Sequence, residues 1–270
     1  SVLTERWNQL LFGISYPAEH YWRPTMAFVL LFFAAAPVLF FDLPRKLLIF
    51  TGVYPFIAYW LIWGGTIWSP VFALGGIVTG YVFYAKFIQS SFAIALFGGV
   101  ATAFITWILS GYIIPSISPE TPFFEAVPSR NMGGFMLNMI LGTVCVSLSL
   151  PLGIMLALGR QSNMPVIKAI CVVFIEFIRG VPLITLLFVA NVVLSYFFPP
   201  DANIDLVLRV IIMITLFSAA YIAEVIRGGL AALPIGQYEA ADSLGLDYPQ
   251  AMRLIILPQA LKISIPGIVN

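Results

Sequence analysis

Apolar residues form long, nearly uninterrupted runs along this chain, and short polar segments separate them. A helix needs about 20 mostly apolar residues to cross the roughly 30 Å hydrocarbon core of a bilayer. Seven stretches come close to that length or meet it: Thr25–Phe41, Leu47–Gly65, Pro70–Ile88, Phe92–Ile114, Gly133–Leu158, Val181–Phe198 and Ile204–Ala223. An eighth run begins near Leu257 and is cut short at Asn270. The pattern predicts an all-α, polytopic transmembrane helical bundle.

Composition supports this interpretation. Hydrophobic residues make up 61% of the chain and charged residues 9%, whereas soluble domains carry about 25% charge. Lipid is therefore the expected solvent for most of the chain. The net charge of +1 gives nucleic-acid binding no electrostatic support. Cys145 and Cys171 show no CxxC or Cys/His spacing, so we expect packing roles and neither a disulfide framework nor a metal site.

The positive charges predict the orientation. Alternating the spans places nine of them on one side: Arg45, Lys46, Lys86, Arg160, Lys168, Arg179, Arg227, Arg253 and Lys262. Four fall on the other side: Arg6, Arg23, Arg130 and Arg209. Cytoplasmic loops carry an excess of Lys and Arg, so the first side is expected to face the cytoplasm.

This orientation divides the chain into an extracytoplasmic segment 1–24, accessory transmembrane helices 25–114, an extracytoplasmic loop 115–132 and a second membrane region 133–270. The second region contains a cytoplasmic loop, residues 224–256. No signal segment follows Ser1, and the last apolar run is short. We therefore expect a fragment of a longer polypeptide, truncated at both ends.

The cytoplasmic loop predicts a helix, a glycine turn and a second helix. Residues 237–244 have helical character, and Gly245 is suited to end the helix in the left-handed conformation. Asp247 is a plausible N-cap with Pro249 in the first turn. The apolar residues that follow continue as a helix, which Pro258 is expected to break or kink.

The residues of this loop fit the pattern EAA-x3-G-x9-I-x-L-P. They are Glu239, Ala240, Ala241, Gly245, Ile255, Leu257 and Pro258. The small side chains of Ala240 and Ala241 would let a partner approach the first helix closely. The plain alternative is an ordinary surface hairpin. The full spacing resembles the EAA motif of type I ABC-transporter permeases, which implies a coupling helix that docks into a cytoplasmic ATPase.

Further runs resemble the polar amino-acid subfamily of these permeases, including EFIRGVPL at 176–183, AEVIRGG at 223–229 and PQALK at 258–262. The resemblance is closest to the larger permease subunit of general L-amino-acid transport systems. It covers residues 133–270 closely, residues 1–65 loosely and residues 66–132 weakly. It implies that 133–270 is an incomplete permease core. Asn138 stands where Thr is usual in the family.

Two Glu-x-x-Arg-Gly repeats occur, at Glu176/Arg179 and Glu224/Arg227. Residues three apart on a helix share a face and can pair. The plain interpretation is that both arginines anchor cytoplasmic helix ends. Alternatively the pairs form a cytoplasmic interface, or the glutamates face a polar cavity, for which Glu224 is the better candidate.

Polar residues also lie inside the expected spans: Asn191 with Ser195, and Thr215 with Ser218. Hydrogen bonding between helices is the plain interpretation. A substrate path through these residues and Glu224 is the alternative, and Asn138 could join it.

The ATP-binding signature GxxxxGK[ST] does not occur in residues 1–270, where no lysine follows a glycine. The single histidine, His20, is expected to be a surface residue, and no catalytic constellation or metal site is predicted. We expect a transport subunit that is not itself an enzyme and holds no cofactor, with ATP and Mg on a partner chain.

The resemblance implies the permease subunit of an ATP-driven importer of L-amino acids, with broad specificity, in the bacterial cytoplasmic (inner) membrane. Implied partners are an ABC ATPase dimer, a second homologous permease, a periplasmic amino-acid-binding protein and the lipid bilayer. The alternative is a secondary amino-acid transporter without an ATPase, and a membrane-embedded enzyme is less favoured still.

Overall fold

The computed structural model describes residues 6–40, 42–87, 98–99, 101–103, 105–106, 109–110, 113, 123–193, 196 and 205–270. Over these residues the chain is helical, and the pairing of Gly65 with Phe124 is an isolated bridge. The chain divides into two compact units, Ser1–Leu137 and Asn138–Asn270. Most of the expected fourth span, Phe92–Ile114, lies outside the described residues.

The all-α, polytopic prediction is confirmed. Among the described residues, six helices are long and apolar enough to cross a membrane: Ala18–Leu39, Arg45–Trp63, Trp68–Phe87, Gly134–Gln161, Leu206–Ala231 and Tyr248–Val269. A bent pair, Pro165–Gly180 with Leu183–Val192, would make a seventh if it counts as one span.

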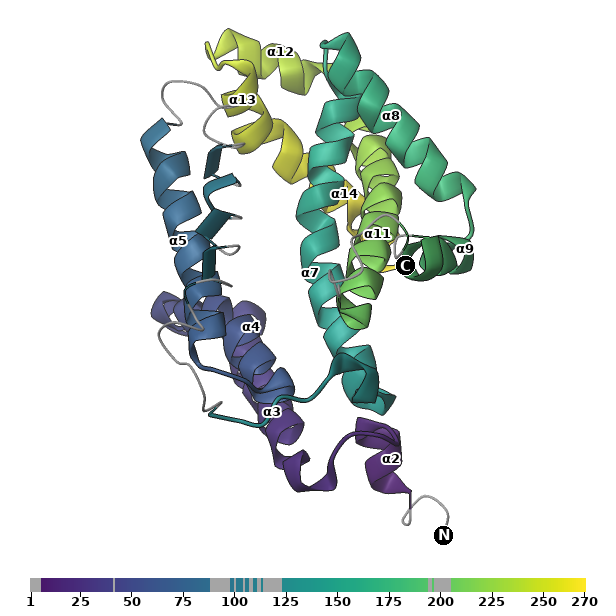
Figure 1. The fold of residues 1–270 in the computed structure, drawn as a ribbon. Coiled ribbons are helices and arrows are strands. Elements are labelled where there is room, and N and C mark those ends of the chain that lie inside the picture. Colours follow the sequence, from purple (N-terminus) through teal and green to yellow (C-terminus); the bar gives the residue numbers. More distant parts are fainter. Residues whose placement is uncertain are drawn as a thin grey trace. The chain divides into compact units, whose positions relative to one another are not determined.

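The first unit contains α2 (Trp7–Phe12), η1 (Ala18–His20), α3 (Trp22–Leu39), η2 (Arg45–Leu47), α4 (Leu48–Trp63), α5 (Trp68–Phe87) and η3 (Ser129–Asn131) (Figure 1). Helices α3 and α4 lie against each other. Thr51 on α4 donates from Oγ1 to the carbonyl of Ala34 at 2.7 Å, and the Tyr54 hydroxyl donates to the carbonyl of Ala27 at 2.9 Å. Such bonds compensate for the lack of hydrogen-bonding partners in hydrocarbon.

Arg23, at the start of α3, is only 1% exposed. Its Nε donates to the Leu61 carbonyl at 2.7 Å, and its Nη1 donates to the Glu125 carbonyl at 2.9 Å. The guanidinium also lies 5.1 Å from the ring centroid of Phe124. Arg23 therefore joins α3 to the end of α4 and to the segment near Phe124 instead of acting as a free surface charge.

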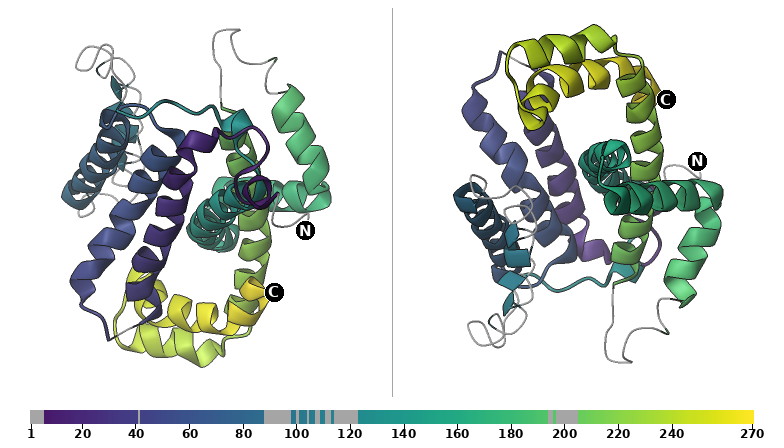
Figure 2. Two further views of the ribbon diagram at one scale, coloured as in Figure 1. Left: turned by 90° about the horizontal axis from the view of Figure 1, so that it is seen from below. Right: turned by 90° about the horizontal axis from the view of Figure 1, so that it is seen from above.

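The second unit contains most of α7 (Gly134–Gln161), then α8 (Pro165–Gly180), α9 (Leu183–Phe188), the π-helix η4 (Val189–Val193) and α11 (Leu206–Ala231). It ends with α12 (Ile235–Ser243), α13 (Tyr248–Ala251), the π-helix η5 (Met252–Ile256) and α14 (Leu257–Val269). Figure 2 shows α12 lying alongside the helix that runs from α13 into α14.

One hydrophobic core joins these helices. Its buried members come from α7, α8, α11 and the α13–α14 helix: Ala157, Ile175, Ala223, Ile226, Leu230, Met252, Ile256 and Ala260. Helices α11 and α14 approach closely at Gly229, where an added Cβ would collide with the Ser264 hydroxyl and lie 2.6 Å from the Ala260 carbonyl oxygen. This core holds the segment after α11 against the membrane helices.

The expected sixth span, Val181–Phe198, begins at a sharp bend that the apolar pattern did not predict. Residues 165–180 form α8, and the chain then bends by 103° into α9 and η4. The bend lies at Val181 and Pro182, where both residues leave the helical conformation with ψ of 132° and 139°. Proline disfavours the helical conformation of the residue before it, which explains the break.

Two expected helix ends are wrong. Helix α11 does not stop at Ala223 but continues to Ala231, so Glu224 and Arg227 are helical residues. Pro258, which was expected to break or kink the second helix of the loop, does not break it, because α13, η5 and α14 run on as one helix from Tyr248 to Val269. The π-helical turn η5 directly precedes Pro258 and accommodates the missing backbone donor.

Candidate functional site

Helix α12 ends as its sequence predicts. Gly245 adopts φ +71°, its N–H donates to the Asp242 carbonyl at 2.9 Å, and the N–H of Leu246 donates to the Ala241 carbonyl at 3.2 Å. This is the Schellman arrangement that glycine allows after a helix. A Cβ at Gly245 would meet nothing within 4 Å. Conformation, and not space, therefore requires glycine here.

The following helix begins at a capping box. The Asp247 Oδ1 accepts from the Gln250 N–H at 2.8 Å, and the Gln250 side chain accepts from the Asp247 N–H at 3.3 Å. The predicted N-cap is confirmed. The two caps together fix the turn between α12 and α13, and we refer to residues 235–251 as the α12–α13 hairpin.

The motif residues divide between an exposed face and the core. Glu239, Ala240 and Pro258 are exposed, Ile255 and Leu257 are partly buried, and Ala241 is fully buried. The expectation that both alanines face a partner is therefore wrong for Ala241. Successive helical residues are about 100° apart, so one alanine packs inward while the other points out.

A side-chain contact ties α12 to α14. The amide nitrogen of Gln259 lies 2.9 Å from the amide oxygen of Gln237 and 3.0 Å from the Ile255 carbonyl. Both glutamines are partly buried, so water competes little for these bonds. Sequence analysis missed this contact, since the partners are 22 residues apart.

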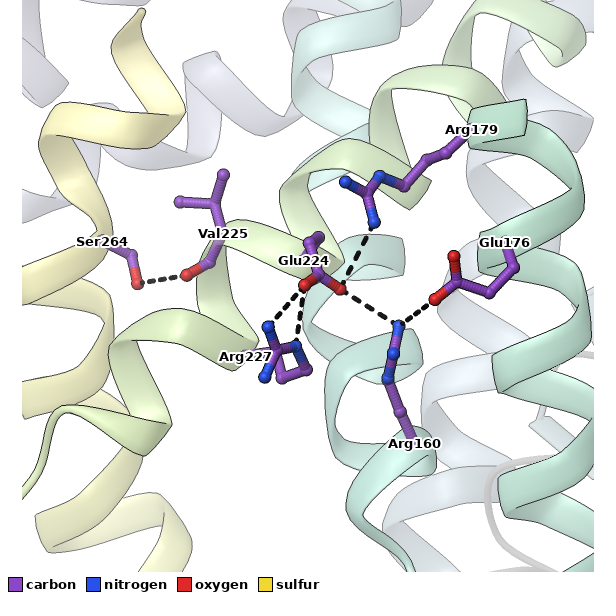
Figure 3. Close-up of polar contacts among 7 residues, drawn as sticks. All are labelled: Arg160, Glu176, Arg179, Glu224, Val225, Arg227 and Ser264. Carbon is purple, nitrogen blue, oxygen red and sulfur yellow. Dashed lines mark hydrogen bonds and ion pairs between the residues drawn. The ribbon is translucent and has the colours of Figure 1, made fainter. Parts of the chain in front are cut away.

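Five charged residues gather where α7, α8 and α11 meet, and we call them the ion cluster: Arg160, Glu176, Arg179, Glu224 and Arg227 (Figure 3). Glu224 is its centre. Its Oε1 accepts from Arg227 Nη2 at 2.6 Å and Nε at 2.8 Å. Its Oε2 lies 3.0 Å from Arg160 Nη1 and 3.5 Å from Arg179 Nη1.

The two repeats behave differently. The Glu224–Arg227 pair expected from the sequence is present as an i,i+3 pair. Glu176 instead pairs with Arg160 at 3.0 Å, while Arg179 turns toward Glu224 and lies 5.5 Å from the Tyr221 ring centroid. The predicted i,i+3 pair between Glu176 and Arg179 is therefore absent. Three cations face two carboxylates, so the cluster carries a net positive charge.

Arg160 is the residue of this cluster that sequence analysis did not single out. It occupies the last turn of α7, two residues beyond the expected end of that span. Its glutamate partners lie 16 and 64 residues away in sequence, on other helices. The helical extension of α7 brings it into place, and no local spacing signals that.

The residues of the expected substrate path do not share one environment. On α7, Asn138 is exposed, and Asn191 in η4 is also exposed, with its carbonyl accepting from Arg209 at 3.2 Å. Thr215 is 4% exposed, and Ser218 beside it on α11 is partly buried. Ser195 lies outside the described residues. The structure brings Thr215 and Ser218 onto one helix without joining them to the asparagines.

In the first unit, Glu19, His20 and Glu125 each offer one ligand atom within 4.8 Å of the others. His20 Nε2 lies 3.3 Å from Glu125 Oε2. The Glu125 side chain is 75% exposed. Water therefore supplies most of the hydrogen bonds to its carboxylate. His20 and Glu125 contact each other, and Glu19 is their exposed acidic neighbour.

Residues 149–270 match the family described as the binding-protein-dependent transport system inner membrane component. The chain is 54% identical over 273 residues to the glutamate/glutamine/aspartate/asparagine transport system permease protein BztC of Rhodobacter capsulatus, covering 100% of this chain and 63% of that protein. It is 38% identical over 269 residues to the inner membrane amino-acid ABC transporter permease protein YhdY of Escherichia coli, covering 98% of this chain and 58% of that protein.

A crystal structure of an amino acid ABC transporter with histidines matches 49% of this chain and 59% of its own at 36% identity, with a TM-score of 0.42. The chain spans about six-tenths of the length of BztC and of YhdY. The family description and the candidate membrane helices together make it a multi-pass protein of the inner membrane. Its residues 149–270 belong to the family of binding-protein-dependent transport system inner membrane components, and the whole chain is similar to amino-acid ABC transporter permeases.

Proposed function

We propose that this chain is the transmembrane permease subunit of an ATP-driven importer of L-amino acids. The observation that carries the proposal is the construction of the α12–α13 hairpin. Glu239 and Ala240 are exposed on α12, while Ala241 and the Gln237–Gln259 contact hold α12 against the membrane helices. A force applied to the exposed face is therefore transmitted directly into the helix that contains α14.

The hairpin would dock on an ATPase dimer that supplies ATP, Mg and hydrolysis from separate chains. Residues 1–270 have no phosphate-binding signature of their own. Glu239 and Ala240 would contact the ATPase, and Gly245 would fix the angle between the two helices. The buried residues around Ile256 would pass the movement on to α7, α8 and α11.

The proposed cargo is a broad set of polar L-amino acids. The name of BztC includes two acidic amino acids and their two amides. An extracytoplasmic binding protein would deliver the amino acid, and a second homologous permease would complete the pathway. Glu224, Thr215 and Ser218 on α11 remain the proposed contacts along the path, with Asn138, Asn191 and Ser195 as further candidates.

ATP-driven uptake is the direct test. The full-length protein, reconstituted into liposomes with its ATPase, second permease and binding protein, is expected to accumulate labelled L-glutamine only when ATP is present on the hairpin side. Ionophores that collapse proton and sodium gradients are expected to leave uptake unchanged. Uptake that requires an ion gradient and does not depend on ATP would favour a secondary transporter instead.

A further inference from the structure

A cavity of about 650 Å³ lies in the second unit beside the α12–α13 hairpin. Residues from the end of α7, the start of α8, the end of α11, the hairpin and η5 line it: Arg160, Gln161, Asn163, Lys168, Val172, Arg227, Ala231, Tyr238, Tyr248 and Met252. No role in the transport cycle described above uses this cavity.

The lining is strongly biased in charge. It includes three cations, Arg160, Lys168 and Arg227, and no carboxylate. Glu224 and Glu176 bind the two arginines, yet neither glutamate lines the cavity. Clefts lined by one sign of charge concentrate ions of the opposite sign. The expected occupant is therefore an anion.

Donors remain available for such an anion. Arg227 binds Glu224 through Nε and Nη2, so its Nη1 is not engaged by that carboxylate. Arg160 reaches both of its glutamates through Nη1, so its Nε and Nη2 are also outside those ion pairs. Lys168 is exposed. Guanidinium groups recognise carboxylates with several N–H donors at once. Arg160 and Arg227 already bind one carboxylate, that of Glu224.

The neutral part of the lining suits an amino acid. The amide oxygens of Gln161 and Asn163 can accept hydrogen bonds from an α-ammonium group, and the hydroxyls of Tyr238 and Tyr248 can donate to a carboxylate. Tyr238 belongs to α12 and Tyr248 to α13. A ligand in the cavity would therefore touch the hairpin itself.

We propose that this cavity is a release site for acidic amino acids on the hairpin side of the transporter, which rests on the proposed function. Arg160, Lys168 and Arg227 hold the side-chain carboxylate, and Gln161 with Asn163 holds the ammonium group. L-Glutamate therefore binds more tightly than L-glutamine, which has the same shape without the charge. Because the occupied site contacts α12, accumulated L-glutamate inhibits further import.

Product inhibition of the complete reconstituted transporter tests this. Uptake of labelled L-glutamine is measured while unlabelled L-glutamate, L-glutamine or inorganic phosphate is added on the hairpin side. We expect L-glutamate to inhibit at about tenfold lower concentration than L-glutamine, and phosphate to inhibit weakly. Lys168→Gln is expected to reduce the glutamate preference about fivefold, and Lys168→Glu to abolish it.

Lys262→Gln is the matched control. It removes the same charge from an exposed position on α14 that does not line the cavity, so the glutamate preference is expected to stay at the wild-type value. Equal inhibition by L-glutamate and L-glutamine in the wild type would overturn the proposal. So would phosphate inhibiting as strongly as L-glutamate, or equal effects of Lys168→Gln and Lys262→Gln.

Failure of the proposed function would look different, because no amino acid would be taken up with ATP at all. The site is then tested by binding of labelled L-glutamate to the purified full-length protein. Saturable binding that L-glutamine displaces poorly and that Lys168→Gln weakens would support it. The absence of saturable binding would overturn it.

Discussion

Arg160 at the end of α7 donates to the carboxylate of Glu224 on α11 at 3.0 Å, across 64 residues of sequence. The same carboxylate also accepts from Arg227 one turn later and faces Arg179 on α8. One side chain, 22% exposed, thus links three helices beside the hairpin. Removing the carboxylate would leave three guanidinium groups close together without their shared counter-charge.

Glu224→Gln is therefore expected to destabilise the protein by about 2 kcal/mol, below the cost of breaking a fully buried pair because water still reaches the site. The measurement is thermal unfolding of the purified full-length protein in detergent. Glu176→Gln is the matched comparison, since that side chain is 54% exposed and has one arginine partner. Equal melting temperatures for the two variants would contradict the central position of Glu224.

The close contact between α11 and α14 gives a second prediction. Gly229→Ala is expected to destabilise the protein by about 2 kcal/mol, because its Cβ would overlap the Ser264 side chain and press on the Ala260 carbonyl. Gly228→Ala, at the adjacent position with open space around it, is expected to be neutral or slightly stabilising. Thermal unfolding separates them, and similar melting temperatures would show that the helices do not pack through Gly229.

The contact between Gln259 and Gln237 gives a third prediction, concerning coupling more than stability. Gln259→Leu removes the bond to α12 and puts an apolar side chain of similar size in its place. We expect ATP hydrolysis stimulated by the loaded binding protein to fall several-fold while the melting temperature changes little. Gln9→Leu, which removes an exposed amide from α2 in the first unit, serves as the control. Unchanged stimulation in Gln259→Leu would rule out this contact as a transmission point.

The capping box gives a fourth prediction. Asp247→Ala is expected to cost about 1 kcal/mol of local helix stability, and Asp247→Ser to retain most of it, because serine can also accept from the Gln250 N–H. Hydrogen exchange of the backbone amides in residues 248–252 should be faster in Asp247→Ala and close to wild type in Asp247→Ser. Equal protection in both variants would mean that tertiary packing alone fixes the start of α13.

Local features of the fold were predictable from the sequence. At Gly245 and Asp247 one helix ends and the next begins through bonds that span three to five positions, so short-range patterns carry the information. The long apolar runs likewise predicted most of the membrane helices. The 103° bend after Gly180 was missed because apolar composition hides a broken helix, although Pro182 marks the place.

The ion cluster was only half predictable, because residue spacing indicates contacts within one helix and not contacts between helices. The i,i+3 pair of Glu224 and Arg227 follows from helical geometry. The partners of Glu176 and Arg179 depend on how α7, α8 and α11 pack, and residue spacing does not predict that packing. Equally, the sequence could not tell that Ala241 would turn into the core while Ala240 stayed exposed.

The central claim is that the α12–α13 hairpin docks on an ATPase, and capture of the ATPase by the full-length permease tests it most directly. Wild type and Gly236→Ala, a change at an open position on α12, are expected to retain the ATPase through purification in equal amounts. Gly245→Val, which puts a branched side chain at φ +71°, is expected to reach the membrane normally and lose it. Equal capture by Gly245→Val, or no capture by the wild type, would contradict the account.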